Sequence, residues 1–192
     1  MTVEQILEAI KDIPSNVADQ DTVMHVKYLS DLPIRQTQGE PGNPLILDFG
    51  TGWGKLIISI ALACPQAEIY TFDPGIPYTP GGGDVYIYAD KVRQILNNHL
   101  GKDLHFHIND SYKHEWDREL DVLSIDASHT YEDTKHEIEK YWSFVKSGGL
   151  ILMHDYIVER VGVKQAVDEY MAEHPEYQIL ESAGYTTVIK KL

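Results

Sequence analysis

The residues best suited to binding a ligand lie in one short stretch, Asp48-Phe-Gly-Thr-Gly-Trp-Gly54. Its three glycines alternate with larger residues, so no Cβ atom at those positions keeps a ligand away from the backbone. Backbone N–H groups at the start of a helix point outward and bind ligands. Asp48 is expected at the mouth of this pocket, where a carboxylate disfavours a phosphate and favours a cation or a hydroxyl donor.

The segments on either side of this turn predict a strand and a helix. Before it, Leu45, Ile46, Leu47 and Phe49 form an apolar run typical of a strand buried on both faces of a parallel sheet. After it, apolar residues recur with helical spacing at Leu56, Ile57, Ile60, Ala61 and Cys64. The stretch therefore predicts a strand, a ligand-binding turn and a helix.

The pattern Asp48-x-Gly50-x-Gly52-x-Gly54 resembles the first motif of the class I S-adenosylmethionine (SAM) dependent methyltransferases. The resemblance implies that the turn passes under the methionine part of SAM, with the acidic residue near its amino end. It implies the cofactor-binding residues Asp48, Gly50, Thr51, Gly52, Trp53 and Gly54. A dinucleotide fingerprint, Gly-x-Gly-x-x-Gly, is one alternative, but Lys55 occupies its third glycine position. A turn without a ligand is the other.

Two further carboxylates follow predicted strands. The second strand, 68–73, ends in Asp73, where a carboxylate can accept hydrogen bonds from ribose hydroxyls. Its alternative role is a helix cap or a solvated side chain. The third strand, 104–108, is followed by Asp110, which matches the acidic or polar residue that reaches the adenine in the family resembled.

A second pair of motifs lies further along the chain, at Asp126-Ala-Ser-His129-Thr-Tyr131 and at His154-Asp155-Tyr156. They are similar to a branch of these methyltransferases with Asp-x-x-His-x-Tyr after strand four and His-Asp-Tyr after strand five. That branch includes O-methyltransferases acting on sugars and natural products. The combined resemblance covers residues 45 to about 156 and, by element order, the whole chain.

Strands four and five are neighbours in the methyltransferase sheet, so Asp126 is expected to face His154 and Asp155 across a cleft. Two carboxylates and an imidazole can hold Mg²⁺ or Mn²⁺, and such a metal would lower the pKa of a substrate hydroxyl. Asp126 is also a candidate for direct cofactor contact. Catechol-type O-methyltransferases carry Asp-Asn where this chain has His154-Asp155.

A metal-free reaction is the alternative at this cleft. Because imidazole titrates near neutral pH, His129 or His154 could accept the hydroxyl proton as a general base. Purely structural roles are open for both histidines, as a loop residue bonded to the backbone and as a satisfied strand-end residue.

Composition limits the partners. The 192 residues carry a net charge of −14, which opposes binding to nucleic acid or anionic lipid and favours a small-molecule substrate. The N-terminus lacks the basic region of a signal peptide, and the single cysteine, Cys64, fits a reducing compartment. We expect a cytoplasmic protein with no membrane partner, and either a monomer or a homo-oligomer.

We expect one α/β domain over 1–192. Residues 1–44 form an N-terminal helical cap (3–13 and about 17–30) and a polar connector, and residues 45–192 form a Rossmann-like core. Its seven-stranded sheet is mostly parallel with one antiparallel strand from a C-terminal hairpin, and helices cover both faces. The Pro- and Gly-rich loop 74–84 is either a lid or a flexible surface loop.

These patterns predict a SAM-dependent methyltransferase acting on a hydroxyl oxygen of a small molecule. An NAD-linked oxidoreductase is one alternative, which the C-terminal hairpin and the missing third glycine oppose. A non-catalytic SAM-binding protein is the other. It would keep the cofactor pocket without a substrate site.

Overall fold

The computed structural model of the chain describes residues 1–13, 18–33, 35–37, 40–75, 85–157 and 160–192. Seven strands form one sheet in the spatial order β5-β4-β3-β6-β7-β9-β8. Their bounds are β3 Leu45–Phe49, β4 Glu68–Asp73, β5 His105–Ile108, β6 Leu120–Ile125, β7 Val145–His154, β8 Tyr177–Ala183 and β9 Thr186–Lys191.

All pairings among the first five of these strands are parallel, and β9 runs antiparallel to both β7 and β8. The predicted sheet, with one antiparallel strand from a C-terminal hairpin, is confirmed. The strand order reverses beside β3, because β4 lies on one side of it and β6 on the other. In open α/β sheets, ligands bind at the carboxyl ends of the strands at such a reversal.

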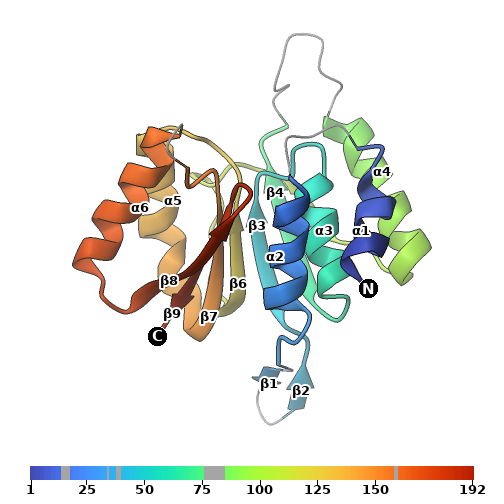
Figure 1. Cartoon of the computed structure of the whole chain (residues 1–192), viewed down its shortest axis with the longest axis horizontal. Coiled ribbons are helices and arrows are strands. Elements are labelled where there is room, and N and C mark those ends of the chain that lie inside the picture. Colours follow the sequence, from blue (N-terminus) through green and yellow to red (C-terminus); the bar gives the residue numbers. More distant parts are fainter. Residues whose placement is uncertain (14–17, 34, 38–39, 76–84, 158–159) are drawn as a thin grey trace.

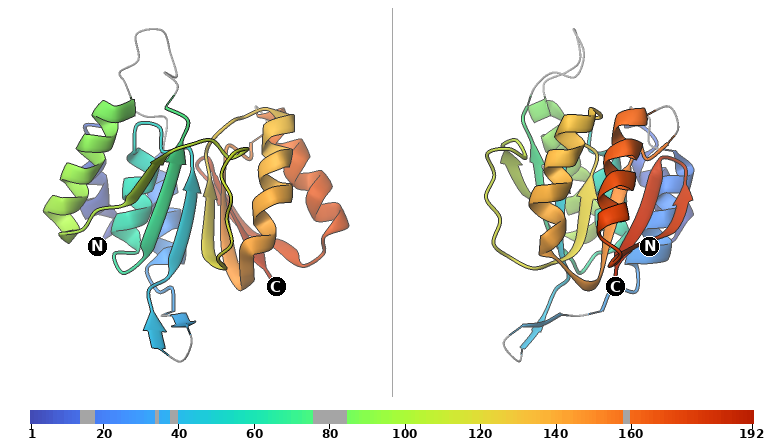
Figure 2. Two further views of the ribbon diagram at one scale, coloured as in Figure 1. Left: turned by 180° about the vertical axis from the view of Figure 1, so that it is seen from behind. Right: turned by 90° about the vertical axis from the view of Figure 1, so that its left-hand side faces the viewer.

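Helices cover both faces of the sheet (Figure 1), so the molecule has three layers. One face carries α1 Val3–Ile10, α2 Asp19–Leu29, α3 Lys55–Ala63 and α4 Val85–Leu100, and the other carries α5 Tyr131–Tyr141 and α6 Val161–Glu173. Figure 2 shows the same separation from behind and from the side. Each helical layer packs on its own hydrophobic core.

The two cores share β3, whose side chains alternate between them. Ile46 belongs to the core under α1–α4, whereas Leu45, Leu47 and Phe49 belong to the core under α5 and α6. Successive strand residues point to opposite faces, so a strand buried on both sides is apolar at most positions. This explains the apolar residues that precede the glycine turn, among which Asp48 is the single polar side chain.

The segment after α2 differs from the prediction. Where the sequence indicated a polar connector, 36–44, the chain forms a small antiparallel hairpin of β1 Arg35–Thr37 and β2 Glu40–Gly42. Figure 1 shows it extending away from the main sheet. Two strands of three residues are too short to show a hydrophobic period, so the sequence pattern could not reveal them.

Two other expectations concern the ends of elements. The apolar run 150–153 predicts the fifth strand, but the strand begins earlier, at Val145, after a 3-10 turn at Trp142–Phe144. Of the proposed lid 74–84, residues 76–84 lie outside the described part of the chain. Among the described helices, none combines the length and apolarity that crossing a bilayer requires.

Candidate functional site

The glycine turn connects β3 to α3, and each of its glycines has a positive φ: +97° at Gly50, +48° at Gly52 and +87° at Gly54. A Cβ atom at Gly50 would lie 2.0 Å from the backbone oxygen of Asp126, and one at Gly54 would lie 2.1 Å from a methyl group of Val92. These two glycines therefore allow close packing within the protein.

Gly52 has a different environment. The nearest heavy atom to a Cβ added there would be the backbone oxygen of Gly50, 3.9 Å away. No packing contact requires a glycine at this position. The open space over Gly52 is the kind of backbone surface that a ligand can approach closely.

Asp48 is fully buried, so the expectation that it lies at the mouth of a pocket is wrong. It is the fourth residue of β3, and its neighbours across the sheet are Thr71 on β4 and Ser124 on β6. Thr71 Oγ1 donates a hydrogen bond to Asp48 Oδ2 at 2.7 Å and lies beside Thr51 Oγ1. Burial raises the pKa of Asp48 to about 7. The carboxyl group thus supports the turn through Thr71, whose hydroxyl group contacts that of Thr51.

Asp73 lies at the carboxyl end of β4, directly beside the turn. Its Oδ2 accepts a hydrogen bond from the backbone N–H of Gly52, and its Oδ1 accepts one from Gly75, both at 2.8 Å. Each carboxylate oxygen has a second lone pair for another donor. The structure therefore brings together the glycine turn and the predicted ribose-binding carboxylate.

Asp110 lies beyond the end of β5 and bonds Lys113, accepting from its backbone N–H at 2.9 Å and from Nζ at 2.7 Å. The loop around it rests on α5. Ser111 Oγ donates to Glu137 at 2.9 Å, and Tyr112 Oη donates to Asp133 at 2.7 Å. No sequence motif points to Glu137, which is buried on α5 although that helix has a polar sequence.

Four ionisable side chains converge at the ends of β6 and β7. His154 Nδ1 lies 3.0 Å from Asp126 Oδ1 and 3.6 Å from Asp155 Oδ2. His129 Nε2 lies 2.8 Å from Asp155 Oδ2 and 3.7 Å from Asp126 Oδ1. The predicted proximity of the two strand ends is therefore present, and His129 belongs to the same cluster.

The charges of this cluster are strongly coupled. The carboxylates of Asp126 and Asp155 raise the pKa of His129 to about 9. Burial opposes the charged form of His154, but the carboxylates around it outweigh burial and raise its pKa to about 12. Burial likewise opposes the Asp155 carboxylate, yet the two imidazoles hold its pKa well below the usual range. Both histidines are thus protonated at neutral pH when only protein groups surround them.

The backbone at Asp155 is unusual. Among the described residues it is the only non-glycine with a positive φ, 58°. Its N–H donates to the carbonyl of Tyr185 at 2.8 Å, and its carbonyl accepts from Ile157 at 2.8 Å. Left-handed conformations of non-glycine residues occur preferentially at functional sites, where the surrounding structure holds them. Here the conformation places Asp155 within the cluster.

The cluster fits a divalent cation. One ligand atom each from Asp126, His154 and Asp155 can be chosen so that all three lie within 4.8 Å of one another. An octahedral cation with bonds of about 2.1 Å requires adjacent ligand atoms about 3 Å apart. Both His154 nitrogens are buried without a hydrogen bond of good geometry. Once a cation displaces the proton on one nitrogen, that nitrogen can bind it. Two carboxylates and one imidazole suit Mg²⁺ or Mn²⁺.

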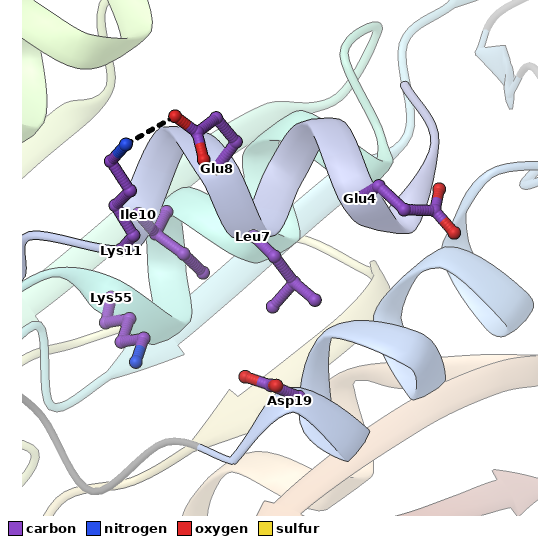
Figure 3. Close-up of a pocket in the computed structure, with 7 residues that line it drawn as sticks. All are labelled: Glu4, Leu7, Glu8, Ile10, Lys11, Asp19 and Lys55. Carbon is purple, nitrogen blue, oxygen red and sulfur yellow. Dashed lines mark hydrogen bonds and ion pairs between the residues drawn. The ribbon is translucent and has the colours of Figure 1, made fainter.

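A cavity of about 470 Å³ lies between the two N-terminal helices and the start of α3 (Figure 3). It is formed between α1, the start of α2 and Lys55, the first residue of α3, and its lining is Glu4, Leu7, Glu8, Ile10, Lys11, Asp19 and Lys55. None of the four cluster residues lines it. The cavity therefore adjoins the start of α3, and residues 50–54 of the glycine turn do not line it either.

The two histidines on β5 serve a different purpose. His105 stacks on Tyr70 with ring centroids 4.3 Å apart, and His107 stacks on Phe72 at 4.7 Å. Each pair consists of direct neighbours across β4 and β5. Both histidines are exposed, and each packs flat on an aromatic ring.

This sheet order, with an antiparallel strand inserted beside the last parallel one, is the arrangement expected of class I SAM-dependent methyltransferases. The model of a family described as a methyltransferase domain matches residues 47–156, more than half of the chain. The chain therefore belongs to this family of methyltransferase domains. A comparison with curated proteins gave no match.

Solved structures share the fold at low sequence identity. TrmN from Thermus thermophilus is 13% identical, with a TM-score of 0.64, and the match covers 99% of this chain but 53% of TrmN. A SAM-dependent O-methyltransferase from Thermotoga maritima is 15% identical, with a TM-score of 0.66 and coverage of 100% and 72%. The O-methyltransferase TomG from Streptomyces achromogenes, solved with SAM, is 14% identical, with a TM-score of 0.63 and coverage of 98% and 88%. This chain thus spans about half the length of the first of these proteins.

Proposed function

We propose that this chain is a SAM-dependent methyltransferase whose acceptor is a hydroxyl oxygen of a small molecule. The observation that carries the proposal is the close approach between the glycine turn and the ionisable cluster. At Gly50, the backbone of the turn comes so near the backbone of Asp126 that a Cβ atom would lie 2.0 Å from its oxygen. A donor on the turn and an acceptor at the cluster would therefore be neighbours, as methyl transfer requires.

The donor site would be formed by the turn Gly50, Thr51, Gly52, Trp53 and Gly54, with Asp48 supporting it. SAM supplies a methyl group on an activated sulfonium. Asp73, whose carboxylate accepts a bond from Gly52, would also accept from ribose hydroxyls, and Asp110 would reach the adenine. The open space over Gly52 supports this assignment. Lys55 in place of a third glycine disfavours a dinucleotide in the same turn.

The acceptor site would be formed by the cluster, with Asp126, His154 and Asp155 holding Mg²⁺ or Mn²⁺. A bound cation lowers the pKa of a hydroxyl group and fixes its position. The pKa values of about 9 for His129 and about 12 for His154 leave both rings protonated at neutral pH, which opposes a role for either ring as a general base. A cation would have to displace the proton on Nδ1 of His154 to bind there. His129 would then hold Asp155 in place through their 2.8 Å contact.

A small-molecule acceptor agrees with the electrostatics of the chain. Its net charge of −14 opposes association with a polyanion such as RNA. The motifs Asp126-x-x-His129-x-Tyr131 and His154-Asp155-Tyr156 favour the branch that methylates sugars and natural products. We therefore propose polyhydroxylated or phenolic acceptors.

Transfer of labelled methyl groups from SAM to a panel of catechols, phenols and sugars, with Mg²⁺ or with EDTA, tests the proposal. Methylation that requires Mg²⁺ and is lost in Asp126→Asn would support it. Metal-independent methylation would contradict the metal assignment alone. A separate arm of the experiment offers small RNA substrates. If the protein binds SAM but methylates neither the small molecules nor the RNA, the result would favour the non-catalytic SAM-binding alternative.

A further inference from the structure

A buried carboxylate outside the sequence motifs, that of Asp21 on α2, lies behind the ionisable cluster. Its side chain is fully buried. Oδ1 accepts hydrogen bonds from the backbone N–H groups of Tyr185 and Thr186, both at 2.8 Å, and Oδ2 accepts from Ala18 at 2.7 Å. Three backbone donors therefore stabilise a charge that burial alone would strongly disfavour.

The same carboxylate faces His154 from the side opposite the candidate metal ligands. Asp21 Oδ2 lies 3.9 Å from His154 Nε2, whereas Asp126 Oδ1 lies 3.0 Å from Nδ1 of the same ring. Thr186, whose backbone N–H donates to Asp21, is also the direct cross-strand neighbour of His154. The imidazole therefore lies between a carboxylate of the N-terminal helices and the carboxylates at the ends of β6 and β7.

The turn between β8 and β9 is shaped to receive Asp21. Gly184 has a φ of +62°, and a Cβ atom there would lie 2.7 Å from Asp21 Oδ1. The left-handed glycine thus allows the turn to close around the carboxylate. The turn therefore fixes the position of Asp21 by packing and hydrogen bonds, and His154 lies near enough to interact with its charge.

Imidazoles that bind a metal through one nitrogen commonly donate the N–H of the other to a carboxylate. That partner fixes the tautomer and the orientation of the ring, and its loss typically weakens metal affinity by about 10- to 100-fold. The 3.9 Å between Nε2 of His154 and Asp21 Oδ2 is an ion-pair distance, longer than a hydrogen bond. We propose that Asp21 is a positioning residue whose carboxylate attracts the proton to Nε2 and so directs Nδ1 of His154 toward the cation site. This inference rests on the proposed metal-assisted function, and it makes α2 a part of the site.

The test compares Asp21→Asn with a matched control, Tyr28→Phe. The control removes the bond from Tyr28 Oη to Glu181 at 2.7 Å, so it loosens the packing of α2 on β8 without touching His154. Calorimetric titration with Mn²⁺ is expected to show about tenfold weaker binding in Asp21→Asn and unchanged binding in Tyr28→Phe. Equal affinities of the wild type and Asp21→Asn would overturn the proposal.

Nitrogen-15 NMR of the His154 ring provides a second readout that needs no activity. With Mg²⁺ bound, wild-type His154 is expected to carry its proton on Nε2, the nitrogen that faces Asp21. A proton on Nδ1 would overturn the proposal. This measurement uses the wild type alone, so it does not depend on whether Asp21→Asn folds. If neither metal binds the wild type, the metal assignment is wrong. In that case the positioning role is tested without metal. It predicts that the His154 ring resonances shift in Asp21→Asn and do not shift in Tyr28→Phe, and any other result would overturn the positioning role too.

Discussion

Asp126 Oδ1 lies 3.0 Å from His154 Nδ1, at the carboxyl ends of two adjacent parallel strands. The register pairs Ile125 of β6 with Met153 of β7, so the next residue of each strand reaches the same edge of the sheet. This is the side of the sheet at which the glycine turn follows β3. The two motifs of the sequence thus meet in one site because the fold aligns the ends of β3, β6 and β7.

Metal binding at this site is expected to strengthen as pH rises. With pKa values raised to about 9 and about 12, His129 and His154 carry protons at neutral pH, and a cation must displace at least the proton on Nδ1 of His154. Each displaced proton makes the affinity rise about tenfold per pH unit below the pKa. Calorimetry with Mn²⁺ at pH 6, 7 and 8, in buffers of different ionisation enthalpy, measures both the trend and the released protons. Affinity independent of pH would contradict this account.

Two neighbouring glycines are expected to respond differently to alanine. Gly52→Ala should fold, at a cost of about 1 kcal/mol for a left-handed alanine, because no protein atom lies close to the new Cβ. Its methyl group would occupy the proposed donor site and weaken S-adenosylhomocysteine binding at least tenfold. Gly50→Ala should lose more than about 4 kcal/mol of stability, because its Cβ meets the backbone of Asp126.

Urea unfolding and calorimetry of the two glycine variants check this contrast. The unfolding measurement separates the packing role of Gly50 from the ligand role of Gly52. Gly52→Ala that folds and binds S-adenosylhomocysteine as tightly as the wild type would place the donor elsewhere.

Glu137 is expected to make the protein less stable as pH rises. Burial raises its pKa from 4.5 to about 7, against the stabilising bond from Ser111. Between these two pH values the folded state binds more protons than the unfolded state, so the free energy of unfolding falls as pH rises. Glu137→Gln removes this dependence. Between pH 4.5 and pH 8, the free energy of unfolding of the variant should rise by up to about 3 kcal/mol relative to that of the wild type.

Urea denaturation of both proteins at pH 4.5, 6 and 8 measures that difference. Glu132→Gln is the matched control, because Glu132 is exposed on the same helix. The control should follow the wild type at every pH. A wild type and a Glu137→Gln variant with parallel pH dependence would show that Glu137 titrates normally.

The sequence predicted those parts of the site that depend on local patterns. An apolar run, three alternating glycines and a helical period define the strand, turn and helix around Gly52, and strand-end motifs place Asp126 near His154 once the strand order is known. Asp48 was misplaced because its position depends on burial between two neighbouring strands, Thr71 on one and Ser124 on the other. No local pattern reports such a contact.

Long-range polar contacts were also beyond the sequence. Asp21 on α2 meets the turn at Gly184 and the ring of His154, residues far away in the chain. Glu137 and Asp133 hold the loop after β5 from a helix whose sequence is polar. A carboxylate on an amphipathic helix usually indicates a solvated face, so only the tertiary structure identifies these as supporting residues.

Calorimetric titration of the wild type with S-adenosylhomocysteine, and separately with NAD, distinguishes a SAM site from a dinucleotide site. We expect micromolar binding of S-adenosylhomocysteine and no binding of NAD. We also expect at least tenfold weaker binding of S-adenosylhomocysteine in Asp73→Ala, which loses the carboxylate bonded to Gly52. Binding of NAD without S-adenosylhomocysteine would contradict the account and assign the glycine turn to a dinucleotide.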